Sequence, residues 1–199
     1  MKKSLLVGLA LPLIFSFAAL ASPILQDNQA MDAVSQKSYD RILKEVRHEL
    51  VMLPYYGVFD NLSYKVDPDG TVILLGQVAR PTLKSDAENV VKRIEGVTKV
   101  VNNIEVLPNS MIDDQIRRAT YRAIFGNEVL SQYQMRAVPP IHIIVKNGNV
   151  TLEGVVARQM DKQIAGMQAN QVPGVFGVTN NLMVEEQDKK EDKKDDKKK

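Results

Sequence analysis

The sequence contains no cysteine and no tryptophan, and only two of its 199 residues are histidine. The lack of cysteine excludes disulfide bonds, thiolate nucleophiles and metal sites with cysteine ligands. An excess of charge of one sign is missing too. When Lys2 and Lys3 of the N-terminal segment are set aside, 24 basic residues balance 24 acidic ones. The overall charge therefore gives no reason to expect nucleic-acid binding, and 44% apolar residues indicate an ordinary globular protein.

The N-terminal segment has the parts of a secretory signal peptide. A positive start is followed by an apolar run over residues 5–20, and Ala19-Leu-Ala21 provides a small-x-small cleavage pattern. The run is short for a membrane span, so we expect removal of residues 1–21, with cleavage after Ala21, rather than a retained anchor. Ser22 stands where a lipoprotein needs cysteine. We therefore expect a periplasmic or secreted protein without a lipid anchor.

One strand pattern occurs twice, over residues 70–80 and 148–158. In both copies Val, Leu and Val alternate with other residues, which is typical of a half-buried strand. Each copy also has a glycine in mid-strand, Gly76 and Gly154. A glycine in this position indicates a bulge or a close approach of another backbone segment.

The duplication extends well beyond this strand. Residues 69–106 and 147–184 align without a gap, with 15 identities in 38 positions. Each copy has the order helix, strand, strand, helix, strand, and the second copy has about four additional residues within 127–140. Two copies are too few for a solenoid, so the pattern predicts two tandem small domains.

The segments outside these domains differ from them in composition. Residues 22–37 show no sustained period and are expected to form a flexible leader. A helix is expected from Tyr39, with Pro54 ending it. Residues 185–199 contain seven acidic and seven basic residues and nothing apolar, so we expect a disordered charged tail.

Two motifs follow one another in each copy: Gly-x-Val-x-Leu-x-Gly-x-Val from Gly70 and Gly-Val-x-x-Val-x-Asn-x-(Ile/Leu)-x-Val from Gly96, with both repeated 78 residues later. In these motifs the chain resembles the BON (bacterial OsmY and nodulation) domain family, over residues 40–108 and 113–184. The resemblance implies an α+β fold in which helices cover a small mixed three-stranded sheet in each domain. It also implies a non-enzymatic bacterial envelope protein without a cofactor. Family members are thought to bind phospholipid surfaces or to protect the envelope under osmotic stress.

The first helix of the second copy has an unusual polar face. Its apolar side comprises Ile112, Ile116, Ala119, Thr120, Ala123 and Ile124. The opposite side comprises Arg118, Tyr121, Arg122 and Phe125. Such a face suits an anionic phospholipid headgroup, with the rings at the membrane interface. Two alternatives remain: both rings lie beneath the loop over 127–140, or this face packs against the first copy.

The second helix of the second copy carries Met160 and Met167 opposite its expected core positions. Exposed methionines form an adaptable surface for a protein partner, as in a soluble periplasmic chaperone or protein-interaction module. A shift in helix register, or packing between the domains, would bury them instead. His48 and His142 lie in different copies without a carboxylate pattern nearby, so no metal or catalytic role is expected. The expected partner is an anionic phospholipid surface or an envelope protein, contacted peripherally.

Overall fold

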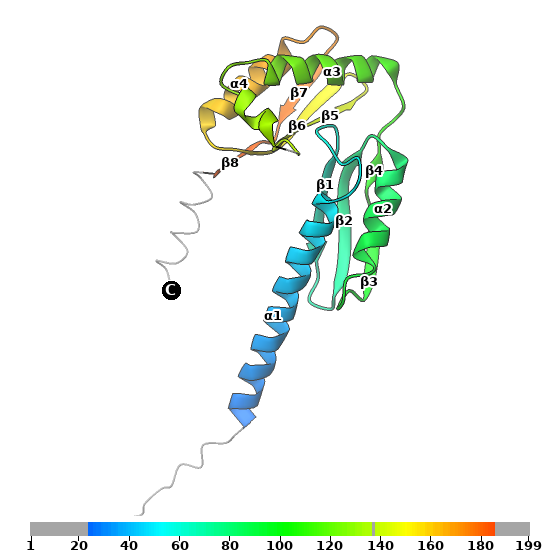
Figure 1. The fold of residues 1–199 in the computed structure, drawn as a ribbon, viewed down its shortest axis with the longest axis vertical. Helices are drawn as coiled ribbons and strands as arrows, with labels where there is room; N and C mark the ends of the chain where they lie inside the picture. Colours follow the sequence, from blue (N-terminus) through cyan, green and yellow to red (C-terminus); the bar gives the residue numbers. More distant parts are fainter. Residues whose placement is uncertain (1–23, 137, 186–199) are drawn as a thin grey trace, which may run out of the picture. The chain divides into compact units, whose positions relative to one another are not determined.

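The duplicated pattern folds as two repeats of the same element order. The computed structural model describes residues 24–136 and 138–185, with side chains from residue 36 onward, and the described residues from 37 onward belong to one unit. The first repeat contains α1 (Ile24–Val51), β1 (Asn61–Val66), β2 (Thr71–Val78), α2 (Pro81–Val91), β3 (Lys99–Asn102) and β4 (Glu105–Val106) (Figure 1). The second contains α3 (Met111–Phe125), the 3-10 helix η1 (Ser131–Met135), β5 (Ile141–Lys146), β6 (Asn149–Val156), α4 (Gln159–Asn170), β7 (Gly177–Asn180) and β8 (Met183–Val184).

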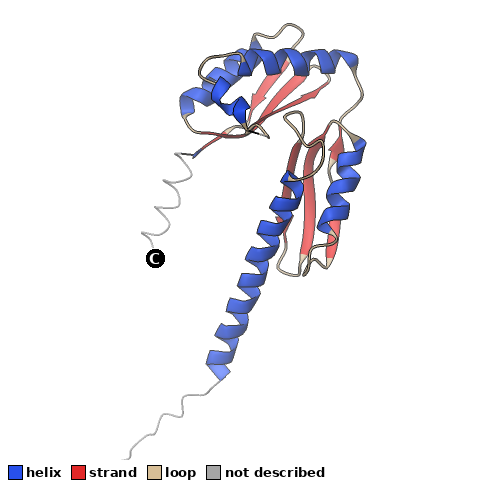
Figure 2. Ribbon diagram, in the orientation of Figure 1, coloured by secondary structure: helices blue, strands red, loops and turns tan. Residues whose placement is uncertain are grey.

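Each repeat has one mixed sheet, which confirms the α+β prediction (Figure 2). In the first repeat, β2 is antiparallel to β1 and parallel to both β3 and β4. In the second repeat, β6 pairs in the same way with β5, β7 and β8. The third strand of each repeat is therefore divided into two short pieces that keep one register against the central strand.

In each repeat, an asparagine at the break in the third strand forms a hydrogen bond to the second helix. Asn102 Nδ2 donates to the carbonyl oxygen of Lys84 in α2 at 2.8 Å, and its Oδ1 accepts from Ile104 N at 3.2 Å. Asn180 makes the same two kinds of bond, the first of them to Lys162 O at 2.7 Å. Both side chains are thus used to satisfy backbone groups.

The helices of each repeat lie on one face of its sheet. The side chains of Val72, Leu74 and Val78 are fully buried against α1 and α2, whereas the alternate residues of β2 are only half-buried. The mid-strand glycines have φ of +111° and +118°. A Cβ on Gly76 would lie 2.0 Å from Asn61 O, and one on Gly154 would lie equally close to the carbonyl before β5. The expected close backbone approach is confirmed in both repeats.

Helix α1 is longer than the sequence pattern indicated. It begins at Ile24 instead of near Tyr39, so the backbone over residues 24–37, expected as a flexible leader, is helical. The physical reason is local: no glycine or proline interrupts residues 24–53. The expected cleavage after Ala21, and all but the first residue of the expected charged tail, lie outside the described residues. No helix in the described ranges has the length and apolar character needed to cross a membrane.

Candidate functional site

Helix α3 carries most of the residues that the sequence singled out. Ser110 caps its start, because the side-chain oxygen accepts from Asp113 N at 3.2 Å. Acidic residues occupy the first turn and Arg122 the last turn, as the helix dipole favours. Arg118 and Arg122, four residues apart, are exposed on one side of this helix, and Tyr121 between them is half-buried. These three residues form the part of the predicted face that remains accessible.

Phe125 does not belong to this accessible face, which corrects the prediction. Only 4% of its surface is exposed, because it packs in the core of the second repeat together with Leu130 and Tyr133. Those two residues come from the longer segment after α3, which folds back as η1. Gln134 Nε2 donates to the hydroxyl of Tyr121 at 2.7 Å. The first alternative, rings beneath the loop, therefore holds fully for Phe125 and in part for Tyr121.

The buried side of α3 also differs from the expected stripe. Ile112 was expected in the core but is 69% exposed, and Asp113 is buried beside it. The carboxylate of Asp113 accepts from Asn147 N at 3.0 Å and from Gly148 N at 2.8 Å. It thereby holds the turn between β5 and β6. Apolar periodicity misses such a residue because a carboxylate is buried only when partners far along the chain satisfy it.

A segment of the first repeat contacts the second repeat next to this face. Val58 O accepts from Ile143 N of β5 at 2.7 Å. The ring of Phe59 lies edge-on to Tyr121, with 6.1 Å between their centroids. Val58 and Phe59 both pack against the core of the second repeat. The alternative in which the α3 face packs on the first copy is therefore also realised in part, through this one segment.

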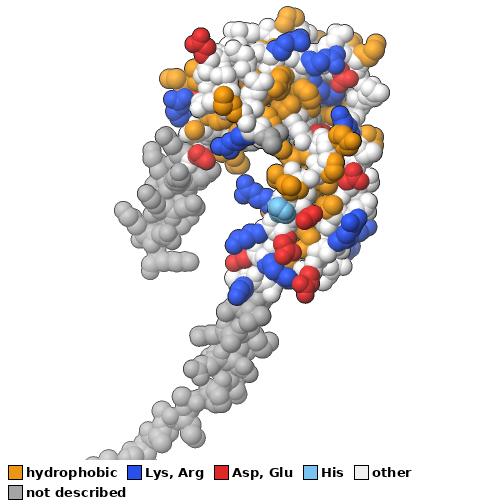
Figure 3. Space-filling view, viewed as in Figure 1, with side chains coloured by type: hydrophobic (Ala, Val, Ile, Leu, Met, Phe, Trp, Pro, Cys, Tyr) orange, Lys and Arg blue, Asp and Glu red, His pale blue; other side chains and the backbone are white. Residues whose placement is uncertain are grey.

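Two hollows meet at Phe59 and Arg118. The smaller, of about 340 Å³, is lined by Val58, Phe59, Arg118, Tyr121 and Arg122. The larger, of about 530 Å³, is lined by Phe59, Ala79, Arg80, Pro81, Val106, Leu107, Pro108, Asn109, Asp114, Arg117 and Arg118. Apolar and basic side chains thus line both hollows. Figure 3 shows one face of the molecule, on which apolar and basic side chains are exposed next to each other.

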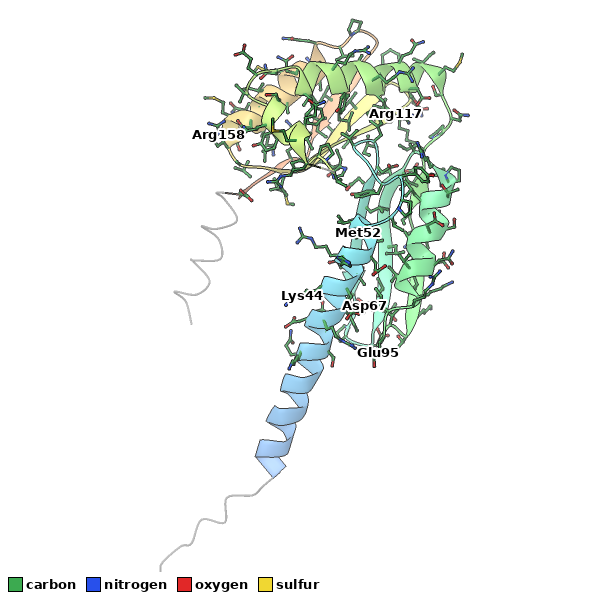
Figure 4. All side chains as sticks on the ribbon, viewed as in Figure 1. Lys44, Met52, Asp67, Glu95, Arg117 and Arg158 are labelled. Carbon is green, nitrogen blue, oxygen red and sulfur yellow. The ribbon has the colours of Figure 1, made fainter. Side chains whose placement is uncertain are left out.

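The positive charge of these hollows is only partly neutralised. Arg117, labelled in Figure 4, is almost wholly buried. It pairs with Asp114 and donates to Val145 O at 2.9 Å. Among the described residues, no acidic group forms an ion pair with Arg80, Arg118 or Arg122. We call these three arginines, together with Phe59 and Tyr121, the arginine face. Its chemistry suits a negatively charged group attached to an apolar body.

Met160 and Met167 lie on another helix and line neither hollow. Both are exposed on α4, by 62% and 55%, so the alternative in which they are buried does not hold. Half-buried Ile164 lies between them in the sequence. The structure therefore does not bring the two methionines together with the arginine face in one site.

The two histidines lie in different environments. His48 is exposed on α1. His142 in β5 stacks on Tyr56, with 5.6 Å between ring centroids, and burial lowers its pKa despite the nearby Asp60. Burial also raises the pKa of Tyr56, to about 12. Within the described ranges, no three histidine or carboxylate side chains gather where a metal ion could bind.

Comparisons with known proteins find one matching family model and two similar solved structures. The BON domain family model matches residues 40–108 and 113–186. Two solved structures are similar: CdsD, a structural protein of the type III secretion system of Chlamydia trachomatis, and its C-terminal domain. The first is 13% identical, with 76% of this chain and 97% of that chain covered and a TM-score of 0.30. The C-terminal domain is 12% identical, with 72% and 96% covered and a TM-score of 0.28. No curated protein matches the sequence significantly.

Proposed function

Because the chain belongs to the BON domain family, whose members are periplasmic, generally non-enzymatic and associated with envelope and phospholipid binding, we propose that it binds anionic phospholipid peripherally through the arginine face. It then acts as a periplasmic binding protein that protects the envelope, including under osmotic stress. The observation that carries this proposal is that Arg80, Arg118 and Arg122, none of which forms an ion pair with a described residue, line two adjoining hollows with apolar walls. A guanidinium binds phosphate oxygens in a bidentate manner.

The aromatic residues of the arginine face support an interfacial position. Phe59 and Tyr121 are half-buried and line the smaller hollow beside Arg118 and Arg122. Aromatic rings favour the boundary between headgroups and acyl chains, while arginines there contact the anionic headgroups. The face therefore offers an apolar contact and an ionic contact within one small surface.

Charge favours the second repeat as the part that contacts lipid. Residues 109–184 contain seven basic and five acidic residues, whereas residues 22–108 contain ten basic and twelve acidic residues. An anionic surface attracts the former and repels the latter, within the Debye length. The equivalent helix face of the first repeat has Lys44, Arg47 and His48 but no aromatic residue.

Vesicle co-sedimentation of the full chain tests this function. We expect binding to vesicles that contain phosphatidylglycerol and much weaker binding to phosphatidylcholine vesicles. The double variant Arg118→Gln/Arg122→Gln should bind anionic vesicles about 30-fold more weakly, since each basic residue near the surface contributes about 1 kcal/mol. Adding salt should reduce binding of the unchanged chain.

A matched control removes the same charge elsewhere. Arg93 and Arg136 are exposed and line neither hollow. The variant Arg93→Gln/Arg136→Gln should lose far less affinity than the Arg118/Arg122 variant. Equal losses would show that net charge alone, and not this face, mediates binding. Equal and weak binding of the unchanged chain to neutral and anionic vesicles at low salt would reject the lipid function.

The exposure of Met160 and Met167 favours a second candidate, a chaperone-like or protein-interaction module. In that case the apolar side of α4 binds exposed apolar segments of other envelope proteins. The variant Met160→Ser/Met167→Ser should then lose its ability to suppress aggregation of an unfolded client and keep its vesicle binding. The arginine variant should behave in the opposite way.

Export is part of this proposal. Cleavage after Ala21 leaves Ser22 as the first residue, without a cysteine for a lipid anchor. Intact-mass measurement of the protein from a periplasmic extract should therefore give a chain that begins at Ser22. A mass corresponding to the uncleaved chain would contradict this part of the proposal.

A further inference from the structure

Methionine is distributed in this protein in an unusual way. The chain has eight methionines, and the structure describes the side chains of six. All six are more than half exposed: Met52 66%, Met111 81%, Met135 91%, Met160 62%, Met167 55% and Met183 55%. Methionine is normally among the residues most often buried. Hydrophobicity alone therefore does not explain these positions.

The two cores show the complementary pattern. Both consist almost entirely of isoleucine, leucine, valine and alanine, and neither contains a described methionine. The chain also has no cysteine, so methionine provides its only sulfur. Every described methionine residue is thus largely exposed to solvent, and none belongs to a core.

We propose that these six methionines are sites of oxidation to sulfoxide, and that the folded protein tolerates their oxidation. The reaction takes its oxygen from a peroxide. The sulfur lone pair attacks one peroxide oxygen, an S–O bond forms and the O–O bond breaks. Sulfur is oxidised by two electrons, the transferred oxygen loses its proton, and the other oxygen takes that proton and leaves as water. The sulfoxide remains open to reduction by a sulfoxide reductase.

The positions of the methionines explain the tolerance. Met52 (Figure 4) directly follows α1, Met111 begins α3, Met135 ends η1 and Met183 begins β8. At an exposed element end, the new oxygen is hydrated and buries no unsatisfied polar group. Burial of a polar sulfoxide in a core would instead disrupt packing. Oxidation at these sites therefore changes the surface and leaves the core unchanged.

Oxidation has a local consequence on α4. Met160 and Met167, seven residues apart, lie on one side of this helix, and sulfoxides turn that side from apolar to polar. No methionine lines either hollow of the arginine face. Oxidation should therefore weaken any contact made by α4 without changing vesicle binding. This inference stands independently of the proposed lipid function.

The experiment exposes the full chain to hydrogen peroxide and follows each methionine by peptide mapping, where a sulfoxide adds about 16 Da. The same reaction in concentrated urea gives the rate for the unfolded chain. We expect each of the six folded-state rates to lie within about threefold of the unfolded rate. The urea midpoint of the fully oxidised protein should equal that of the untreated protein. A methionine protected more than about tenfold, for example by a second copy, would overturn the proposal.

A buried methionine provides the matched control. Leu74 is fully buried in β2, and leucine-to-methionine changes in a core are usually tolerated. In Leu74→Met, the new methionine should be oxidised at least tenfold more slowly than the six surface sites. Its eventual oxidation should lower the urea midpoint. If oxidation of the unchanged chain lowers the midpoint as much as oxidation of this variant, tolerance is disproved.

Discussion

The two repeats satisfy one equivalent backbone amide with different side chains. Directly after the second strand, Ala79 N donates to the carboxylate of Asp60 at 2.8 Å. At the same place in the second repeat, Ala157 N donates to the hydroxyl of Tyr133 at 2.9 Å, and that hydroxyl donates to Asp161 at 2.6 Å. Burial of Tyr133 and its hydrogen bond to Asp161 raise the pKa of this tyrosine. A carboxylate thus supports the amide directly in one repeat and through a tyrosine in the other.

A second pair of equivalent backbone groups, two carbonyl oxygens, also has different side-chain partners in the two repeats. Near the end of the first strand, Val66 O accepts from the hydroxyl of Tyr39 at 3.1 Å. Its counterpart Val145 O accepts from the guanidinium of Arg117 at 2.9 Å. The fold requires that these backbone groups have partners. It does not prescribe which residue type provides the partner, so duplicated sequences diverge at these positions while the topology stays the same.

These different hydrogen-bond partners make the stability of the second repeat more dependent on buried charged side chains. It buries Asp113, Arg117 and Asp161, whereas the first repeat buries only Asp60 among the described charged side chains. Removal of one partner from a buried ionic network usually costs more free energy than the network contributes over an apolar replacement. Equivalent substitutions in the two repeats should therefore change the free energy of unfolding by unequal amounts.

The largest single loss of unfolding free energy is expected from a substitution at Leu83, the counterpart of Asp161. Leu83 is fully buried, and Leu83→Asp should lower the free energy of unfolding by about 4 kcal/mol, since it removes apolar packing and buries a carboxylate. Arg80 occupies the position equivalent to Arg158 and can pair with the new carboxylate. The first repeat has no counterpart of Tyr133, because the segment that carries this tyrosine has about four residues that the first repeat lacks. Urea unfolding followed by circular dichroism measures the change.

The reciprocal substitution sharpens this comparison. Asp161→Leu should cost about 2 kcal/mol, because the hydroxyl of Tyr133 loses its acceptor while leucine fills the position with apolar atoms. If Leu83→Asp proves no more costly than Asp161→Leu, then the two helices provide the same environment. The idea that each repeat specifies its own residue type would then fail.

Smaller individual losses of unfolding free energy, again unequal between the repeats, are expected at the hairpin turns. Asp113→Ala leaves two buried or part-buried backbone N–H groups of the β5–β6 turn without an acceptor, which should cost about 3 kcal/mol. The matched change in the first repeat is Asp69→Ala. Asp69 is exposed and accepts from Thr71 N at 2.9 Å, so its loss should cost about 0.5–1 kcal/mol. Comparable losses of unfolding free energy in the two variants would contradict the proposed role of burial.

The smallest expected effect is a dependence of stability on pH, from His142. Burial lowers its pKa below the ordinary value of 6.5, although Asp60, Glu153 and the backbone near Gly57 act in the opposite direction. The unfolded chain then binds a proton more readily than the folded chain. Stability from this group is complete above pH 6.5 and falls as the pH decreases below it, by at most about 1.4 kcal/mol per pH unit.

Urea unfolding at pH 7.5 and 5.5 measures this difference. The first repeat has Ser63 at the corresponding strand position, so His142→Ser should remove part of the pH dependence. The pKa of Asp60 is raised by burial, so its contribution changes in the opposite direction and at lower pH. An unchanged slope in His142→Ser would exclude His142 as the source.

Part of the candidate site followed from the sequence and part did not. Helical spacing correctly placed Arg118 and Arg122 on an exposed side of α3. The same spacing placed Phe125 beside them, but the segment after α3 folds back and buries it. Periodicity describes one helix and contains no information on what covers it. Phe59 and Arg80 were missed because they reach the site from the first repeat, through contacts between segments far apart in the chain.

By itself, the sequence determined the duplication, the order of the elements and the face of each strand that is buried. Alternation, glycine placement and turn residues act between near neighbours, so the pattern of residues is enough to specify them. The tertiary structure alone decided that Asp113 and Asp161 are buried, that Phe125 is covered and that Phe59 reaches the second repeat. A buried charge or a covered ring depends on partners that only the folded chain brings within a few ångströms.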